Sequence, residues 1–317
     1  MMSNRRRMMM SHRRILSLWL FIYSSFIIKD AAAFSTTVKQ QTVIPPGILG
    51  PPEPLKSLEV GHTLNAFRLA VDDDDDSDPQ KVDFSIERVA NSPNIFILRN
   101  FLTASECKQI QALAEDGGMK TAETITKGDT SSRKNCSVAW IPSSGPGGSS
   151  LVSGLVASTA NIFLSDMVKS HPSVCVEDMQ ILKYDVGGEF VHHQDGDARV
   201  LTVIYYINGV GGTWFPLADR NDGDLPKNKA GVMKLVENFE PGKHGIFVKG
   251  DSSNSEQEES NSKYTVLVNK GDAVAFYNYR DEGSAQLDWA ALHCGSPTDE
   301  TKWIANHWYR LNELSNY

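Results

Sequence analysis

The stretch Tyr184–Asp195 reads YDVGGEFVHHQD, and both the fold and the site are predicted outward from it. A glycine pair precedes an extended segment that ends in two histidines and an aspartate. Side chains two residues apart on an extended strand lie on the same face. His193 and Asp195 are therefore predicted to point the same way, and His192 is predicted to point to the opposite face.

Short runs rich in β-branched and aromatic residues surround this stretch and indicate strands. They are Asn94–Leu102, Met179–Tyr184, Thr202–Asn208, Tyr264–Val268, Ala273–Tyr277 and Trp303–Leu311. A capping box at Thr103–Glu106 opens one helix, and apolar spacing predicts a second helix from Leu151 to Met167. Two helices followed by many short strands predict a mainly β domain with packed helices (α+β), built on a jelly-roll core.

The N-terminal residues 1–34 form a separate segment. Five arginines precede an apolar run, Ile15–Ile28, and small residues follow at Ala31–Ala33. This order is typical of a secretory signal peptide, and an uncleaved membrane anchor is the alternative. We therefore expect the secretory pathway, in the endoplasmic reticulum or Golgi lumen or anchored to its membrane. The junction also resembles the bipartite signal of complex plastids, which keeps a plastid location open.

The rest of the chain divides by composition. Residues 35–82 are proline-rich and contain five consecutive aspartates, so a disordered linker is expected there. The folded domain is expected over 83–317, with a polar insertion at 217–263. The net charge of −8 and the absence of a basic stripe argue against nucleic-acid binding. The four cysteines form no C-x-x-C pair, and their spacing does not decide whether disulfides form.

A metal site needs a third ligand besides His193 and Asp195. The best candidate is His293, at a strand end in ALHCGSP, whereas Cys294 is expected to turn away into the core. Two histidines and one carboxylate leave three metal positions open, which is the facial triad of non-haem Fe(II) oxygenases. A chelating co-substrate such as 2-oxoglutarate fills two of these positions and leaves one for O2. Its far carboxylate requires a cation, for which Lys302 is the candidate.

Six ordered motifs carry a family resemblance. They are Asn100–Cys107, Tyr184–Asp195, Arg199–Pro216, Lys270–Asn278, Leu287–Pro297 and Lys302–Trp308. Over about residues 90 to 312 the chain resembles the catalytic domain of prolyl 4-hydroxylases, within the 2-oxoglutarate/Fe(II) dioxygenase superfamily. It departs from that pattern in the spacing from His293 to Lys302, which is one residue shorter than usual, and in the length of the 217–263 insertion.

The resemblance implies a double-stranded β-helix and a set of site residues. Iron would be held by His193, Asp195 and His293, and the 5-carboxylate of 2-oxoglutarate by Lys302, with Tyr184, Thr213 and Trp308 in the pocket. The implied reaction is hydroxylation of peptidyl proline to 4-hydroxyproline, which releases succinate and CO2. The implied cofactors are Fe(II), 2-oxoglutarate and L-ascorbate, and the implied partner is a proline-rich polypeptide.

Other functions remain open on sequence alone. A related hydroxylase of lysyl or small-molecule substrates is one, and a non-catalytic metal-binding module on the same fold is another. The His-His-x-x-x-Asp-Gly acyl-transfer motif is not matched, because a single residue separates His193 from Asp195. Halogenases of the same superfamily have a small residue in place of the carboxylate, so Asp195 favours hydroxylation.

Overall fold

The computed structural model describes residues 49–70, 80–122, 132–164, 169, 174–220, 225–226, 228–251, 264–280, 285–312 and 314. The predicted signal or anchor and the aspartate run therefore lie outside the described residues. None of the described helices is both long enough and apolar enough to cross a membrane.

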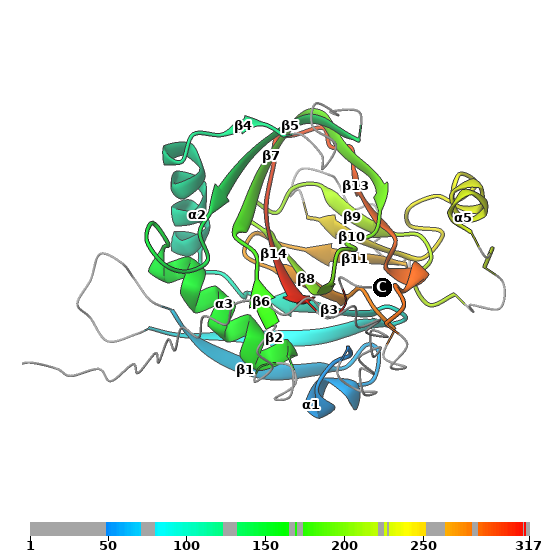
Figure 1. The fold of residues 1–317 in the computed structure, drawn as a ribbon, viewed down its shortest axis with the longest axis horizontal. Helices are drawn as coiled ribbons and strands as arrows, with labels where there is room; N and C mark the ends of the chain where they lie inside the picture. Colours follow the sequence, from blue (N-terminus) through cyan, green and yellow to red (C-terminus); the bar gives the residue numbers. More distant parts are fainter. Residues whose placement is uncertain are drawn as a thin grey trace, which may run out of the picture. The chain divides into compact units, whose positions relative to one another are not determined.

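The described strands join into a 14-stranded sheet that curls around its own interior (Figure 1). The elements in chain order are α1 (Glu53–Lys56), β1 (Thr63–Ala70), β2 (Gln80–Asn91), β3 (Asn94–Arg99), α2 (Ala104–Asp116), β4 (Lys120–Thr121), β5 (Arg133–Ile141), α3 (Ser150–Phe163), β6 (Val174–Val176), β7 (Met179–His193), β8 (Arg199–Tyr206), β9 (Gly212–Phe215), α5 (Lys229–Val236), β10 (Ile246–Gly250), β11 (Thr265–Val268), β12 (Ala273–Tyr277), the 3₁₀ helix η2 (Trp289–Ala291), β13 (His293–Ser296) and β14 (Lys302–Leu311). The predicted mainly β jelly-roll fold with packed helices is confirmed.

The 15-residue strand β7 closes the curl. Its first half pairs with β14, where Tyr184 lies opposite Lys302, and its last residue pairs with β13, where His193 lies opposite His293. Strand order runs β1-β2-β3-β12-β8-β14-β7-β13-β9-β10-β11, so β7 connects the part of the sheet that contains β14 to the part that contains β13. One strand therefore brings both predicted histidines and the predicted lysine into the same interior.

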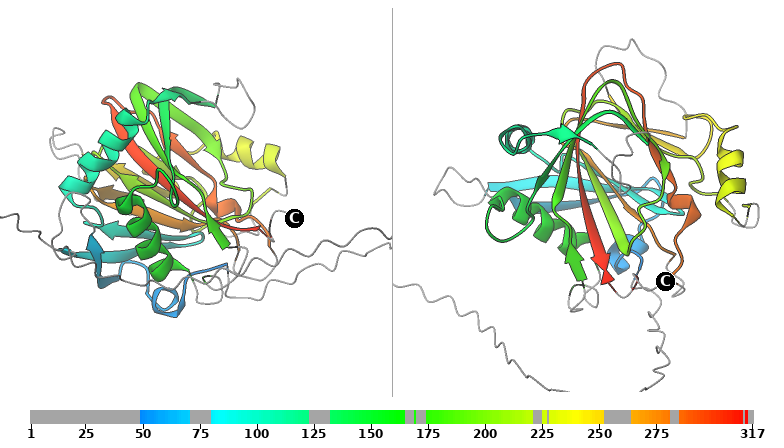
Figure 2. Two further views of the ribbon diagram at one scale, coloured as in Figure 1. Left: turned by 60° about the vertical axis from the view of Figure 1, so that its left-hand side comes forward. Right: turned by 45° about the horizontal axis from the view of Figure 1, so that its top comes forward.

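Alternating side chains divide the apolar residues between two cores. On β12, Val274 and Phe276 enter the core inside the curled sheet. Ala275 and Tyr277 enter the core on the other face, which α2 and α3 cover. Figure 2 shows these two helices together on one side of the sheet, with α5 on the opposite side. Period-two alternation along a strand buried on both faces explains this division.

The linker prediction for 35–82 is wrong over its described part. Strand β1 pairs along its whole length with β2, which itself begins at Gln80. The sequence of β1 does not indicate a buried strand, because its inward face carries the charged residue Arg68. Arg68 forms a buried ion pair with Glu106 and donates from Nε to the Phe101 carbonyl at 2.7 Å. Glu106 also completes the predicted capping box of α2, so edge strand and helix share one carboxylate.

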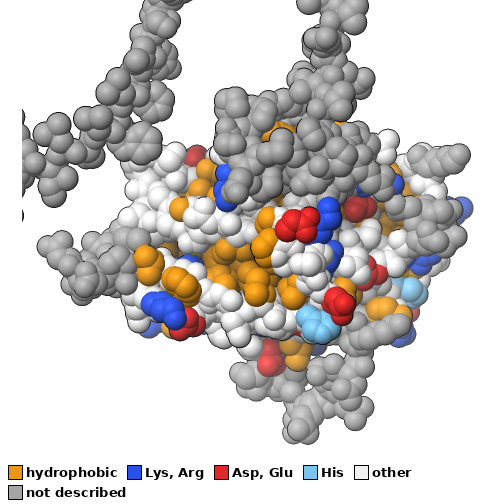
Figure 3. Space-filling model, turned by 90° about the horizontal axis from the view of Figure 1, so that it is seen from below, with side chains coloured by type: hydrophobic (Ala, Val, Ile, Leu, Met, Phe, Trp, Pro, Cys, Tyr) orange, Lys and Arg blue, Asp and Glu red, His pale blue; other side chains and the backbone are white. Residues whose placement is uncertain are grey.

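The face formed by β1 and α1 is apolar at its surface. Phe67 and Leu69 point outward from β1, and Figure 3 shows hydrophobic side chains gathered on this lower side of the molecule. Helix α3 ends at Phe163, before its predicted end at Met167, because Leu164 adopts an extended conformation. All four cysteines are free.

The 217–263 insertion is more structured than its polar composition suggests. It supplies α5 and the sheet strand β10, which pairs with β9 and β11. A small apolar cluster lies under α5 and consists of Leu217, Val232, Val236 and Leu292. The predicted loop therefore contains an element of the jelly roll, and its end, residues 252–263, lies outside the described residues.

Candidate metal centre and co-substrate pocket

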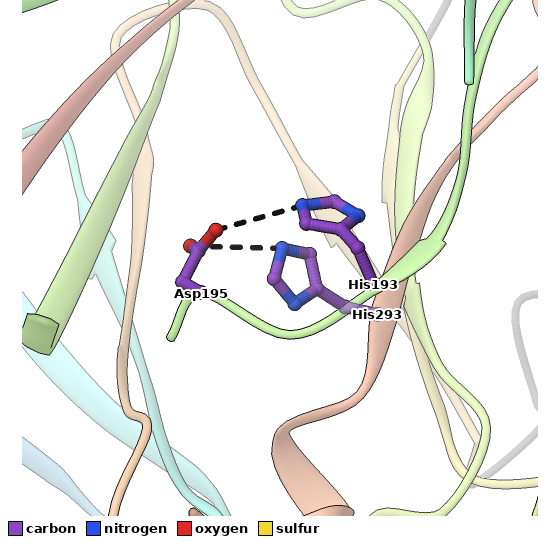
Figure 4. A group of neighbouring side chains, drawn as sticks. All are labelled: His193, Asp195 and His293. Carbon is purple, nitrogen blue, oxygen red and sulfur yellow. Dashed lines mark ion pairs between the residues drawn. The ribbon is translucent and has the colours of Figure 1, made fainter. Parts of the chain in front are cut away.

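Three potential ligand atoms from His193, Asp195 and His293 lie within 4.8 Å of one another (Figure 4). His193 Nε2 is 3.5 Å from Asp195 Oδ1, and His293 Nε2 is 3.8 Å from Asp195 Oδ2. Asp195 and His293 are buried, and His193 is partly exposed. The predicted convergence of these three side chains is what the structure shows.

Local backbone geometry places the ligands at strand ends. Strand β7 ends at His193, so Asp195 reaches the group from the turn that follows rather than as part of the strand. Asp197 and Ala198 adopt positive φ angles of 59° and 64° in this turn. His293 is the first residue of β13 and follows the short helix η2. The site therefore forms where two neighbouring antiparallel strands begin and end.

Both histidines are held in the tautomer that a metal needs. His193 Nδ1 lies 2.9 Å from the Val191 carbonyl, and His293 Nδ1 lies 2.9 Å from the Ala291 carbonyl. Because a carbonyl oxygen only accepts, each Nδ1 carries the proton and each Nε2 keeps its lone pair. Burial lowers the pKa of His293 to about 4, so its imidazole is neutral at physiological pH.

Asp195 is ionised and firmly held. Burial alone would raise its pKa, but the neighbouring imidazoles of His193 and His293 and the Arg199 guanidinium bring the pKa well below its usual range. Its Oδ2 accepts hydrogen bonds from Thr202 Oγ1 at 2.8 Å and from Trp308 Nε1 at 2.9 Å. One carboxylate and two imidazoles thus present lone pairs to a single point.

Lys302 lies in the same cavity, on the first residue of β14. It is 1% exposed, donates to the Gly212 carbonyl at 2.9 Å, and lies 5.5 Å above the centre of the Tyr184 ring. Burial lowers its pKa to about 8. Gly211, with φ of +83°, passes so close to the lysine stem that any Cβ there would overlap it.

The neighbouring Thr213 has a hydroxyl proton to donate. Tyr206 Oη donates to Thr213 Oγ1 at 3.0 Å, so the proton of Thr213 is free for another acceptor. Thr213, Tyr184 and the Lys302 ammonium therefore form a donor-rich pocket. Such a pocket suits a ligand carboxylate.

The structure places all seven predicted site residues around one cavity. Its lining includes His193, Asp195, His293, Lys302, Tyr184, Thr213 and Trp308, together with Arg133, Phe190 and Asn306. His192 lies outside this group, against the Trp214 ring, with the two ring centres 5.4 Å apart. Cys294 is buried and takes no part in the triad. Thr202 was not foreseen, because a threonine inside an apolar strand carries no signal of its own.

The donor set fits a ferrous ion. Two imidazoles and one ionised carboxylate on one side of a point leave room opposite for a chelating ligand and O2. A buried lysine a short distance away fits the far end of a dicarboxylate. A jelly roll with this site defines the class of non-haem Fe(II) oxygenases that use 2-oxoglutarate.

Comparison with known proteins gives the same class. The family model described as "2OG-Fe(II) oxygenase superfamily" matches residues 179–310, from β7 into β14. "Probable prolyl 4-hydroxylase 8" of Arabidopsis thaliana is 27% identical over 244 residues, which cover 73% of each chain. "Prolyl 4-hydroxylase 5" of the same plant is 27% identical over 246 residues, or 72% of each chain.

Among solved structures, the viral collagen prolyl hydroxylase of Paramecium Bursaria Chlorella virus-1 in its 2OG complex is similar with a TM-score of 0.43 and 21% identity. The match covers 70% of this chain and 98% of that one. The family match, the relatives and the triad indicate a 2-oxoglutarate/Fe(II)-dependent dioxygenase of the prolyl 4-hydroxylase type.

Proposed function

We propose that this enzyme hydroxylates C4 of prolyl residues in a polypeptide and converts 2-oxoglutarate and O2 to succinate and CO2. The observation that carries the proposal is the His193–Asp195–His293 group in one cavity with Lys302, in a chain whose matched relatives are prolyl 4-hydroxylases. Ferrous iron held there would bind and activate O2, and oxidation of 2-oxoglutarate to succinate and CO2 would supply the two electrons that replacing a C–H bond by C–OH requires besides those of the C–H bond itself.

The protein's own residues orient the reactants and exclude water. Lys302, Thr213 and Tyr184 would bind the far carboxylate of 2-oxoglutarate, which points the keto acid end toward the triad. Buried apolar side chains next to this pocket, Ile204 and Ile304, keep bulk water away from it. Held in this way, the co-substrate meets O2 in one orientation only.

An exposed tryptophan beside the lining residue Trp308 suits a peptide that contains rings. Trp140 is 48% exposed, and its ring centre lies 6.1 Å from that of Trp308, whose other neighbour is the Arg199 guanidinium at 4.0 Å. Exposed tryptophan faces are the usual docking surface for proline rings in extended segments. We therefore place the chain of the substrate across Trp140 on its way to the metal.

The proposal is tested by incubating the purified chain with Fe(II), 2-oxoglutarate and three peptides of equal length. One is proline-rich, one has alanine for proline, and one has lysine for proline. Mass spectrometry is expected to find an added oxygen on proline of the first peptide only, with an equal amount of succinate. Oxygen added to lysine, or succinate formed without any peptide product, would contradict prolyl hydroxylation.

We also propose that the enzyme works in the secretory pathway and is kept active by ascorbate. The arginine-rich start and apolar run of residues 1–34 support that route. A fluorescent protein fused behind these residues is expected in the endoplasmic reticulum or Golgi, and plastid fluorescence would indicate the bipartite route instead. Turnover that declines at the same rate with and without ascorbate would contradict the second part.

A further inference from the structure

The two oxygens of the Asp195 carboxylate have different surroundings. Oδ2 accepts from Thr202 and from Trp308, which accounts for both of its lone pairs. Oδ1 faces His193 Nε2 at 3.5 Å. If both donors stay in place, Oδ1 is the oxygen that remains for a metal ion.

The direction of each hydrogen bond is fixed by chemistry. An ionised carboxylate only accepts, so Thr202 must use its single proton on Asp195. The partner of Thr202 on its other side must then be a donor, and that partner is Asn278 Nδ2, at 2.8 Å from Thr202 Oγ1. Thr202 and Asn278 are each 1% exposed, so no water competes for these positions.

Asn278 also connects to the segment that carries the distal histidine. The backbone carbonyl of Asn278 accepts from the Asp288 backbone amide at 2.9 Å, and the backbone carbonyl of Asp288 accepts from Gln194 Nε2 at 2.9 Å. Gln194 is the residue between His193 and Asp195. Asp288 in turn caps η2, directly before His293, by accepting from the Ala290 amide.

These contacts form a closed path of hydrogen bonds around the site. It runs from Asp195 through Thr202 and Asn278 to Asp288, and returns through Gln194 to the backbone of Asp195. Apart from the consecutive residues Gln194 and Asp195, each member lies on a different segment, so the path fixes the two ligand-bearing segments relative to each other. Substitution of residues that orient metal ligands by hydrogen bonds typically lowers metal affinity by about 10- to 100-fold.

We propose that Thr202 and Asn278 are positioning residues of the metal centre. Through Thr202, the Asn278 side chain holds Asp195 so that only Oδ1 binds the metal, and the backbone of Asn278 holds the segment of His293 through Asp288. The inference concerns metal binding alone and does not depend on which substrate is hydroxylated.

The test measures Co²⁺ binding to the full chain without 2-oxoglutarate or peptide, by titration and by visible absorption. Thr202→Val removes the donor and keeps the shape, and Thr202→Ser restores the hydroxyl. The matched control is Thr159→Val. Thr159 lies on α3, is also fully buried, and its hydroxyl oxygen lies 3.3 Å from Tyr205 Oη. A general loss of stability would affect both valine variants alike.

Thr202→Val is expected to weaken Co²⁺ binding by about 10- to 100-fold and to change the absorption spectrum, because Oδ2 then keeps only the Trp308 donor and has one lone pair exposed to the metal. Thr202→Ser is expected to bind within about threefold of the wild type, and Thr159→Val to keep both affinity and spectrum. A Thr202→Val protein with the affinity and spectrum of Thr159→Val would overturn the proposal.

Two further measurements do not depend on that variant folding. Asn278→Asp keeps the shape but accepts the Thr202 proton, which draws it away from Asp195, so weaker Co²⁺ binding is expected and unchanged binding would contradict the proposal. A crystal structure of the zinc-loaded wild type is expected to show ligation through Oδ1 alone. Ligation through Oδ2, or through both oxygens, would overturn it.

Discussion

Replacing Lys302 by methionine should weaken 2-oxoglutarate binding and, at the same time, stabilise the fold. The side chain is 1% exposed and contacts the Gly212 carbonyl and the Tyr184 ring, and it forms no ion pair with a carboxylate of the described residues. Burial lowers its pKa from 10.5 to about 8. The folded protein therefore holds a charged amine in an environment that disfavours the charge until a dicarboxylate arrives.

The size of the effect follows from that pKa. Each tenfold change in proton affinity corresponds to about 1.4 kcal/mol. The lowering from 10.5 to about 8 thus corresponds to about 3 kcal/mol of unfolding free energy at pH 7, which methionine of similar shape would restore. The loss of unfolding free energy caused by burying the Lys302 charge has its full size below pH 8, where the folded and unfolded chains both carry the charge. It disappears as the pH rises to 10.5, because the unfolded chain then also loses the proton.

The same pKa sets the pH dependence of co-substrate binding. At pH 9 about one wild-type molecule in ten carries the charge, so 2-oxoglutarate should bind about tenfold more weakly than at pH 7. Calorimetric titration of the zinc-loaded protein measures this affinity, and urea unfolding followed by tryptophan fluorescence measures stability. A methionine variant that binds 2-oxoglutarate normally, or that is less stable than the wild type at pH 7, would refute the reasoning.

Three further outcomes are expected. His193→Ala should abolish turnover through loss of iron, measured by metal analysis after dialysis. Trp140→Ala should raise the KM for a proline-rich peptide about tenfold with little change in 2-oxoglutarate affinity, and Trp140→Phe should restore it, since aromatic docking is worth about 1 kcal/mol or more. Arg68→Met should lower the unfolding free energy by about 3 to 5 kcal/mol, because it leaves the Glu106 carboxylate buried without its ion-pair partner. Urea-induced unfolding measures this free energy.

Each of these expectations has a result that contradicts it. Iron retained at one equivalent in His193→Ala would remove that histidine from the metal site. An unchanged KM in Trp140→Ala would move the peptide away from this tryptophan. An Arg68→Met protein as stable as the wild type would mean that β1 contributes nothing to the fold, and the double variant Arg68→Met/Glu106→Gln should recover part of the loss.

The strands that the sequence predicts well are those whose buried faces carry mainly apolar side chains. Ala273–Tyr277 and Lys302–Leu311 are buried on both faces, so continuous β-branched and aromatic runs mark them. Strand β1 departs from this pattern because its inward face holds Arg68, whose charge is compensated by a helix residue 38 positions away. Strand β10 was hidden inside a polar segment, where its short apolar run resembled loop sequence.

The site divides in the same way. His193 and Asp195, two residues apart, signal a metal site, because few other residue types bind metals. The distant His293 supplies the third ligand. The alternation argument for Asp195 reached the right partners although β7 ends two residues earlier, at His193. Thr202 and Asn278 carry no such signal, because the value of a hydroxyl or an amide depends on the contact it makes across 76 positions of chain.

The apolar cluster under α5 ties the polar insertion to the metal centre. Leu292 is buried in this cluster and is joined by one peptide bond to His293. Shortening the insertion would expose Leu292 to water and release the backbone that aims the imidazole. Changes in the length or sequence of the 217–263 insertion should therefore alter the position of His293 and the activation of O2, although no residue that contacts the reactants is changed.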